Sequence, residues 1–257
     1  MKRFYVIGLC MAMLIVAGES LAAGGGTPAE VIKGYSIVPV ENTGKCIKKQ
    51  PDNTKFDFDQ IVIKKDGVTK KSFCAPIGLV NIKIAYETKT NIYFLVAPDG
   101  IGGYYLFAES VARSLYRYNK AANTVTLVTK DALNVLVGKK IYSIEGAQKI
   151  YCDRTGKQKD MCERIVLRNL GTGKTANYTL PKPNFVVYDY YQFGGFSLSP
   201  DGNRLGMIMA KGDSQAEQGS VYILDIKTAK WTKVLDYKDV VPAISGWSKD
   251  NKTVLMK

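Results

Sequence analysis

The chain has 257 residues, of which 46% are hydrophobic and 11% aromatic, and it carries 36 Lys and Arg against 23 Asp and Glu. This composition excludes an intrinsically disordered chain and predicts a folded protein with a sizeable core. The net charge of +13 favours anionic partners through long-range attraction, although such a surface also keeps a protein in solution. Because the lysines are scattered along the chain, we do not expect nucleic-acid binding.

Residues 1–22 have the pattern of a secretory signal peptide. Lys2 and Arg3 precede the apolar residues 4–17, and Ser20-Leu21-Ala22 places small residues where a signal peptidase cleaves. The apolar run is too short to span a membrane. We therefore expect a periplasmic or secreted protein without a transmembrane span, whose net charge is +12 once Lys2, Arg3 and Glu19 are removed. Residues 23–34 follow as a flexible, Gly-rich stub before a domain of residues 35–257.

The mature chain keeps four cysteines, and an even number in an exported protein predicts two disulfides. Their proximity in the sequence favours the pairs Cys46–Cys74 and Cys152–Cys162. Zinc is the competing interpretation, but no two of these cysteines are spaced as Cys-x-x-Cys and the chain has no His. We expect no metal and no other cofactor.

Short strand candidates, separated by turn-forming residues, follow one another from residue 35. Residues 61–64 and 68–73 flank the turn Asp66-Gly67, a strong hairpin signal. Further units cover residues 80–129, 133–180 and 185–235, and residues 241–257 begin another. Equivalent third-strand positions recur at intervals of 54, 50 and 56 residues, at Ile61, Leu115, Ile165 and Val221. A repeat of this length predicts a β-propeller or a related array.

The clearest repeat is in residues 193–257. Strand-like segments flank the turns Pro200-Asp201-Gly202-Asn203 and Lys227-Thr228-Ala229-Lys230. Gly202 can supply the positive φ that a tight turn needs. The unit then restarts, with Ser248 placed 49 residues after Ser199.

The S-P-D-G turn between two apolar strands, followed by Val221-Tyr222-Ile223-Leu224-Asp225 and a turn to a fourth strand, resembles the repeat of TolB-type, WD-like β-propellers. The resemblance implies an all-β propeller of four-stranded antiparallel blades and a binding role as an envelope scaffold. The resemblance does not imply an active site.

Closing a ring removes exposed sheet edges, so we expect the two ends of the chain to meet. Residues 241–257 and 60–73 would then form one composite blade, which gives four blades with residues 35–49 as added strands. The alternative is five blades, with residues 35–49 as the first two strands of the first. A disulfide between Cys46 and Cys74 favours four, because strands two and four of a blade are too far apart for it.

Catalysis is not expected. Without His, the usual general base and the usual activator of a Ser or Cys nucleophile are missing. The strongest site candidate is instead a basic loop beside a tyrosine cluster at the mouth of the propeller channel. Tyrosine has an apolar face and a polar tip, and it suits either packing between blades or ligand binding. The site residues are Tyr188, Tyr190, Tyr191, Arg154, Lys157 and Lys159. The Asp-Gly turns lie on the opposite face and are interpreted as structural.

The sequence thus predicts an exported, non-catalytic β-propeller that binds an envelope protein or an anionic envelope component. The alternative is a propeller-based enzyme that acts on a glycan or small molecule without His catalysis.

Overall fold

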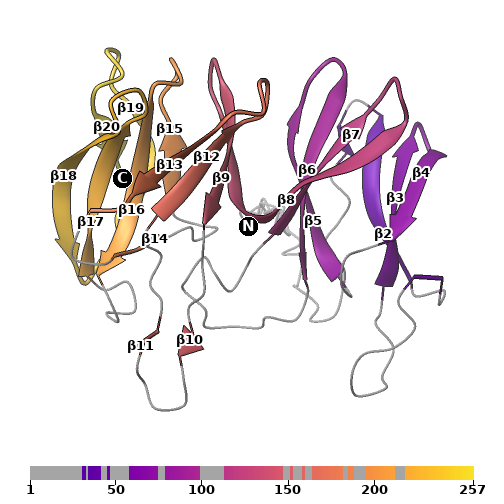
Figure 1. The fold of residues 1–257 in the computed structure, drawn as a ribbon, viewed down its shortest axis with the longest axis horizontal. Coiled ribbons are helices and arrows are strands. Elements are labelled where there is room, and N and C mark those ends of the chain that lie inside the picture. The colour runs from indigo at the N-terminus through magenta and orange to yellow at the C-terminus, as the bar shows by residue number, and fades with distance from the viewer. Residues whose placement is uncertain are drawn as a thin grey trace, which may run out of the picture.

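The computed structural model describes residues 31–32, 34–41, 45–46, 58–74, 79–98, 113–146, 151–152, 158–159, 164–181, 185–187, 195–211 and 218–257. Within these ranges all regular structure is β-strand (Figure 1). No helix in them could cross a membrane. The all-β class predicted from the sequence is therefore confirmed for this part of the chain.

The strands form successive antiparallel sheets. The first sheet has the order β1-β2-β3-β4, and it contains β1 (Val31–Ile32), β2 (Tyr35–Glu41), β3 (Phe58–Lys65) and β4 (Val68–Cys74). The second sheet contains β5 (Leu79–Glu87), β6 (Asn91–Pro98), β7 (Arg113–Asn119) and the first half of β8 (Thr124–Val137). The second half of β8 passes into the third sheet, because β8 pairs with β7 up to Ala132 and with β9 from there on. Strand β8 thus joins the second and third sheets into one hydrogen-bonded set of seven strands.

The third sheet continues with β9 (Ile141–Gly146), β12 (Arg164–Asn169) and β13 (Thr175–Thr179). The fourth sheet contains β14 (Phe185–Val187), β15 (Phe196–Leu198), β16 (Arg204–Lys211), β17 (Gln218–Asp225) and β18 (Lys230–Lys238). The short strands β10 (Tyr151–Cys152) and β11 (Gln158–Lys159) pair with each other, and β19 (Ile244–Trp247) and β20 (Val254–Met256) form a C-terminal hairpin.

Hydrophobic clusters lie between each sheet and the next, so the sheets stack face to face in chain order. Ile37, Ile61 and Ile63 of the first sheet pack on Ile84 and Phe94 of the second. Equivalent clusters join the second sheet to the third, the third to the fourth, and the fourth to the C-terminal hairpin. Figure 1 shows the resulting row of sheets along the longest axis.

Middle strands are buried on both faces, which explains why they read as nearly continuous apolar runs. In β6, Ile92 and Phe94 face the first sheet while Tyr93 and Leu95 face the third. The predicted third-strand positions show the same environment. Ile61, Leu115, Ile165 and Val221 are all 0% exposed, and they lie in β3, β7, β12 and β17 respectively. The repeat predicted from the sequence is therefore confirmed.

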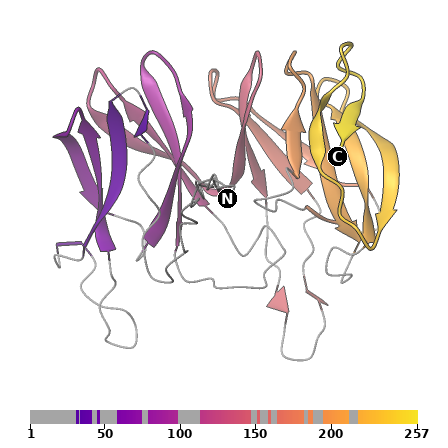
Figure 2. The same ribbon diagram turned by 180° about the vertical axis from the view of Figure 1, so that it is seen from behind.

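The predicted composite blade is not formed. Both edges of β3 are already occupied, one by β2 and the other by β4, so neither β19 nor β20 can pair with it. Among the described strands, the C-terminal hairpin pairs only with itself, and it lies at the opposite end of the long axis from the first sheet (Figures 1 and 2). The row of sheets is thus open, and β2 is the neighbour of β3, as in the five-blade alternative.

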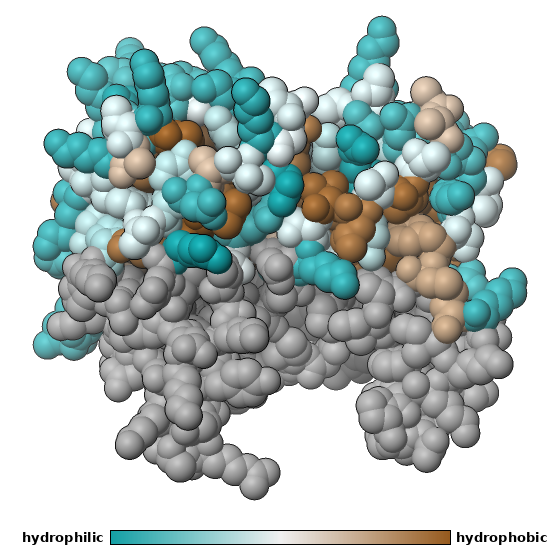
Figure 3. Space-filling view, viewed as in Figure 1, coloured by the Kyte–Doolittle hydropathy of each residue, from teal (hydrophilic) through white to brown (hydrophobic). Residues whose placement is uncertain are grey.

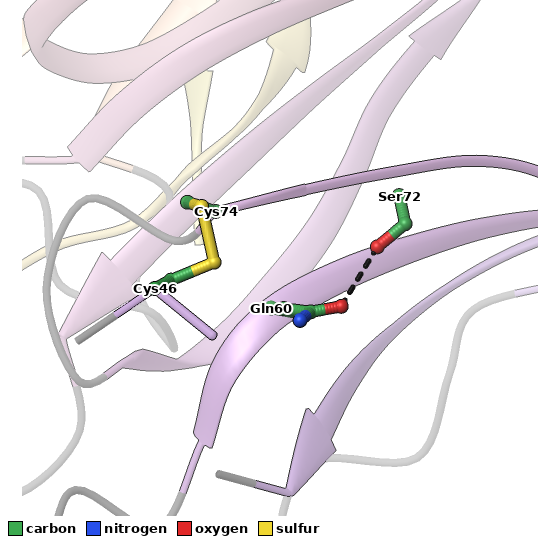
Figure 4. The surroundings of a disulfide bond; sticks show 4 residues. All are labelled: Cys46, Gln60, Ser72 and Cys74. Atoms are coloured by element: carbon green, nitrogen blue, oxygen red, sulfur yellow. Dashed lines mark hydrogen bonds between the residues drawn. A yellow bond between two sulfur atoms is a disulfide. The ribbon is translucent and has the colours of Figure 1, made fainter. Parts of the chain in front are cut away.

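The disulfide Cys46–Cys74 is confirmed, with the two Cα atoms 5.5 Å apart. The expectation that this bond would place residues 35–49 outside β4 was wrong. Strand β2 ends at Glu41, and Lys45 and Cys46 form a bend instead of the predicted strand. Cys46 therefore lies beyond the strand ladder and can reach the last residue of β4. Figure 4 shows the disulfide near the 2.9 Å hydrogen bond that Ser72 donates to Gln60.

The first sheet begins before residue 35, because β1 lies within the segment predicted to be a flexible stub. The predicted signal peptide lies outside the described residues.

Candidate functional site

The predicted basic and aromatic site cannot be assembled from the described residues. Five of its members lie outside them: Arg154, Lys157, Tyr188, Tyr190 and Tyr191. Lys159 belongs to β11, where its backbone pairs with Tyr151. Cys152 lies in β10, and its predicted partner Cys162 is outside the described residues. This site and the second disulfide therefore stay predictions.

A different surface is well defined at the end of the sheets where the hairpin turns lie, the upper rim in Figure 1. We name it the turn face. It consists of the turns and the strand residues that flank them, namely residues 65–68, 87–91, 119–124, 137–141, 169–175, 198–204, 225–230 and 247–254.

The turn between the third and fourth strands is closed in the same way in three successive sheets. A side-chain oxygen at the end of the third strand accepts hydrogen bonds from backbone N–H groups two or three residues later. Asn119 accepts from Ala122 at 2.9 Å, and Asn169 from Thr172 at 3.0 Å. Asp225 accepts from Thr228 at 2.9 Å. Each turn is thus held by its own sequence.

The turns before β16 and β20 repeat one hydrogen-bond pattern at the predicted interval of 49 residues. Ser199 donates to Asp201 at 2.6 Å and accepts from the backbone N–H of Arg204 at 2.9 Å. Ser248 likewise donates to Asp250 at 2.7 Å and accepts from Thr253 at 3.0 Å. Gly202 has a φ of 72°, as the sequence predicted. The two segments are therefore structural repeats.

Hydrogen bonds also join turns of this face to neighbouring sheets. The Asn123 side chain donates to the carbonyl of Lys70 at 2.9 Å. The backbone N–H of Lys139 donates to the carbonyl of Pro200 at 3.1 Å. Arg204 donates to the carbonyl of Asn251 at 2.8 Å. The turn face is thus a connected surface that extends over successive sheets.

This surface is strongly basic. It has eleven basic residues, Lys65, Lys89, Lys120, Lys139, Lys140, Lys174, Arg204, Lys227, Lys230, Lys249 and Lys252. Its five acidic residues are Asp66, Glu87, Asp201, Asp225 and Asp250. The excess is six positive charges, half of the net charge expected for the mature chain. Figure 3 shows hydrophilic side chains projecting along this rim.

Most of the acidic groups are bound within the surface itself. Glu87 pairs with Lys120, Asp66 with Lys65 at 3.6 Å, and Asp225 with Arg204 at 3.9 Å. Seven lysines are exposed and form no ion pair with any described residue: Lys89, Lys139, Lys140, Lys174, Lys227, Lys230 and Lys249. These ammonium groups are available to an anionic partner.

The main buried ionic group elsewhere is fully occupied by hydrogen bonds. Glu145 is 7% exposed and accepts from Arg168 at 2.7 and 3.2 Å, from Ser143 at 3.0 Å and from Thr129 at 3.2 Å. The hydrogen bond to Glu145 is the main cause that raises the pKa of Arg168. This carboxylate therefore stabilises the third sheet. The described residues contain no group of three His, Cys, Asp or Glu side chains suited to a metal ion.

No protein-family model and no curated protein matches the chain. Among solved structures, it is similar to TolB from Acinetobacter baumannii, with 17% identity and a TM-score of 0.39 over 76% of this chain and 41% of TolB. It is also similar to an apocarotenoid oxygenase mutant from Synechocystis, with 14% identity and a TM-score of 0.42 over 83% of this chain and 51% of that one.

A prolyl endopeptidase is a further similar structure, at 13% identity and a TM-score of 0.43 over 87% of this chain and 31% of that one. The chain thus spans about half or less of the length of each of these proteins. Because these TM-scores are below 0.5, the fold described above rests on its strand pairing and hydrophobic clusters.

Sequence reasoning interpreted the turns as structural and missed their charge. A signal was present, because nearly every turn between two predicted strands contains or adjoins a lysine. These lysines are scattered along the sequence. They come together on one surface because neighbouring strands run in opposite directions, which places these turns at the same end of the sheets.

Proposed function

We propose that this protein is an exported, non-catalytic binding module of the β-propeller type. Its turn face would hold an anionic component of the cell envelope or an acidic envelope protein. The observation that carries this proposal is the array of seven exposed lysines that form no ion pair with any described residue, on a surface of hydrogen-bonded turns. A fixed set of like charges raises the local concentration of oppositely charged partners and speeds their association.

Export is supported by the signal-peptide pattern and by the Cys46–Cys74 disulfide, since such bonds persist in oxidising compartments. Binding without catalysis is supported by the chemistry of the chain, which contains no His in any of its 257 residues. The buried carboxylate of Glu145 accepts four hydrogen bonds, so it is not poised as a general acid or base.

The proposal is tested by sedimenting the mature protein with an isolated envelope fraction at several salt concentrations. We expect binding by the wild type that weakens as salt rises. Lys139→Glu, Lys227→Glu should bind far less, because both side chains lie on the turn face. The matched control is Lys83→Glu, Lys238→Glu, which changes the same charge at exposed positions away from the turns.

A third variant, Lys157→Glu, Lys159→Glu, tests the basic loop predicted from the sequence. Loss of binding in this variant alone would move the site to the loop and contradict the turn face. Equal loss in all three variants would show that net charge, and no particular surface, governs binding.

A further inference from the structure

We propose that the turn face docks flat on a membrane surface rich in anionic phospholipid headgroups, without inserting into it. This inference rests on the proposed function and names the partner of the same surface. It commits to lipid headgroups, as distinct from an acidic protein, an acidic glycan or a nucleic acid.

The turn face is broad and follows the row of sheets. In Figures 1 and 2 the turns of the successive sheets lie on the same side over the length of the molecule, with the turn of the first sheet lower than the others. The exposed lysines without an ion pair to a described residue come from the second sheet onward: Lys89 in the second sheet, Lys139 in the third, Lys227 in the fourth and Lys249 in the C-terminal hairpin. The turn of the first sheet contributes Lys65, which is paired with Asp66. A broad array of this kind matches an extended charged surface better than a single compact ligand.

The side chains of the turn face suit phosphate groups better than nucleic-acid bases or sugar rings. The only aromatic residue of the turn face is Trp247, which packs against the C-terminal hydrophobic cluster and donates its indole N–H to Ser197 at 2.9 Å. The turn face therefore offers no free platform on which nucleic-acid bases or sugar rings could stack. The one arginine, Arg204, is already bonded to Asn251 and paired with Asp225. The remaining cations are lysines, which act as point charges and do not form the bidentate fork of arginine. They suit a surface of mobile phosphate groups.

The turn face exposes little apolar surface that could enter the acyl region of a membrane. Only two large apolar side chains of the turn face are strongly exposed, Val68 at 60% and Val137 at 48%. Insertion into the acyl region depends on buried apolar area, whereas attraction to headgroups depends on basic residues near the surface. The turn face has many exposed basic residues and little exposed apolar area, so it rests on the headgroups without inserting.

The test uses the mature protein and protein-free vesicles made of equal parts phosphatidylcholine and phosphatidylglycerol. Vesicles of pure phosphatidylcholine are the lipid control. We expect the wild type to sediment with the anionic vesicles and not with the neutral ones. Each basic side chain near an anionic surface contributes about 1 kcal/mol, or roughly fivefold in affinity. Lys139→Glu, Lys227→Glu should therefore weaken binding at least about 25-fold, whereas Lys83→Glu, Lys238→Glu should bind much more like the wild type.

Three results would overturn the inference. Binding to the envelope fraction but not to anionic vesicles would identify a protein or glycan partner, and the proposed function would stand without a lipid partner. Displacement from vesicles by a nucleic acid or acidic glycan at equal charge concentration would assign the face to linear polyanions. Absence of binding to both vesicles and envelope fraction would contradict the inference and the proposed function together.

Discussion

At the scale of single residues, turn backbones illustrate what a sequence pattern can and cannot predict. The pair Asp66-Gly67 predicted a hairpin, and both residues have positive φ, 50° and 80°, as a type I′ turn requires. Ala229 has a φ of 56° although nothing in its side chain favours that conformation. Its neighbours impose the strain, so the sequence alone could not reveal it.

Ala229→Gly should stabilise the protein by about 0.5–1 kcal/mol, because glycine adopts positive φ without the cost that a Cβ imposes. Urea unfolding measures the change. Ala122→Gly is the matched control, since Ala122 is an exposed turn residue that is not among those with positive φ, and glycine should destabilise it slightly. Destabilisation by both substitutions would contradict the strain at Ala229.

Substitution of Arg168 tests how much its ion pair with the buried Glu145 carboxylate stabilises the protein. Arg168→Met should lower the free energy of unfolding by about 2–3 kcal/mol, because it leaves the nearly buried Glu145 carboxylate without its cation. Arg117→Met, at an exposed position of β7, should cost much less. The double variant Glu145→Leu, Arg168→Met should recover part of the loss, and a strictly additive cycle would show that the two side chains do not act as a pair.

At the scale of elements, most strands were predictable because their physical signals are local. Third strands are buried on both faces, so their apolar runs repeat with the sheets. In the 49-residue repeat, Ser199 and Ser248 each donate to an Asp two residues later and each accept from a backbone N–H five residues later. The order of β2, β3 and β4 was not predictable. Sixteen residues separate Glu41 from Phe58, and a connection of that length does not fix which edge a strand pairs with.

Two carboxylates in the turns make the stability of the folded chain depend on pH in the acid range. The hydrogen bond from Ser199 holds the pKa of Asp201 below its usual value, and the backbone N–H of Thr228 does the same for Asp225. A carboxyl whose pKa is lower in the folded chain stabilises it when ionised. That stabilisation is complete well above the unfolded pKa of about 3.9 and is lost as the pH falls through the lower folded value.

The free energy of unfolding should therefore decline below about pH 4, and it should decline less steeply in the variant Asp201→Asn, Asp225→Asn. Urea titrations across the acid range measure both slopes. Asp239→Asn, at an exposed position after β18, is the control. Parallel curves for the wild type and the double variant would mean that the turn carboxylates do not contribute.

At the scale of the whole molecule, the alternation of strand direction gathers lysines that are distant in the sequence. Lys89 and Lys249 are 160 residues apart, yet both lie on the turn face. The sequence predicted stacked sheets and an envelope protein or anionic envelope component as the partner, with the contact on the basic loop beside the tyrosines, whereas we propose the turn face as the contact. Surface charge could be located only once the direction of each strand was known.

Amine-reactive labelling read by mass spectrometry tests this account most directly, because it reports each lysine separately. With the mature protein bound to the envelope fraction, we predict that Lys139, Lys140, Lys174 and Lys227 become protected, while Lys83 and Lys238 react as in the free protein. Protection confined to Lys157 and Lys159, with the turn-face lysines unchanged, would contradict it.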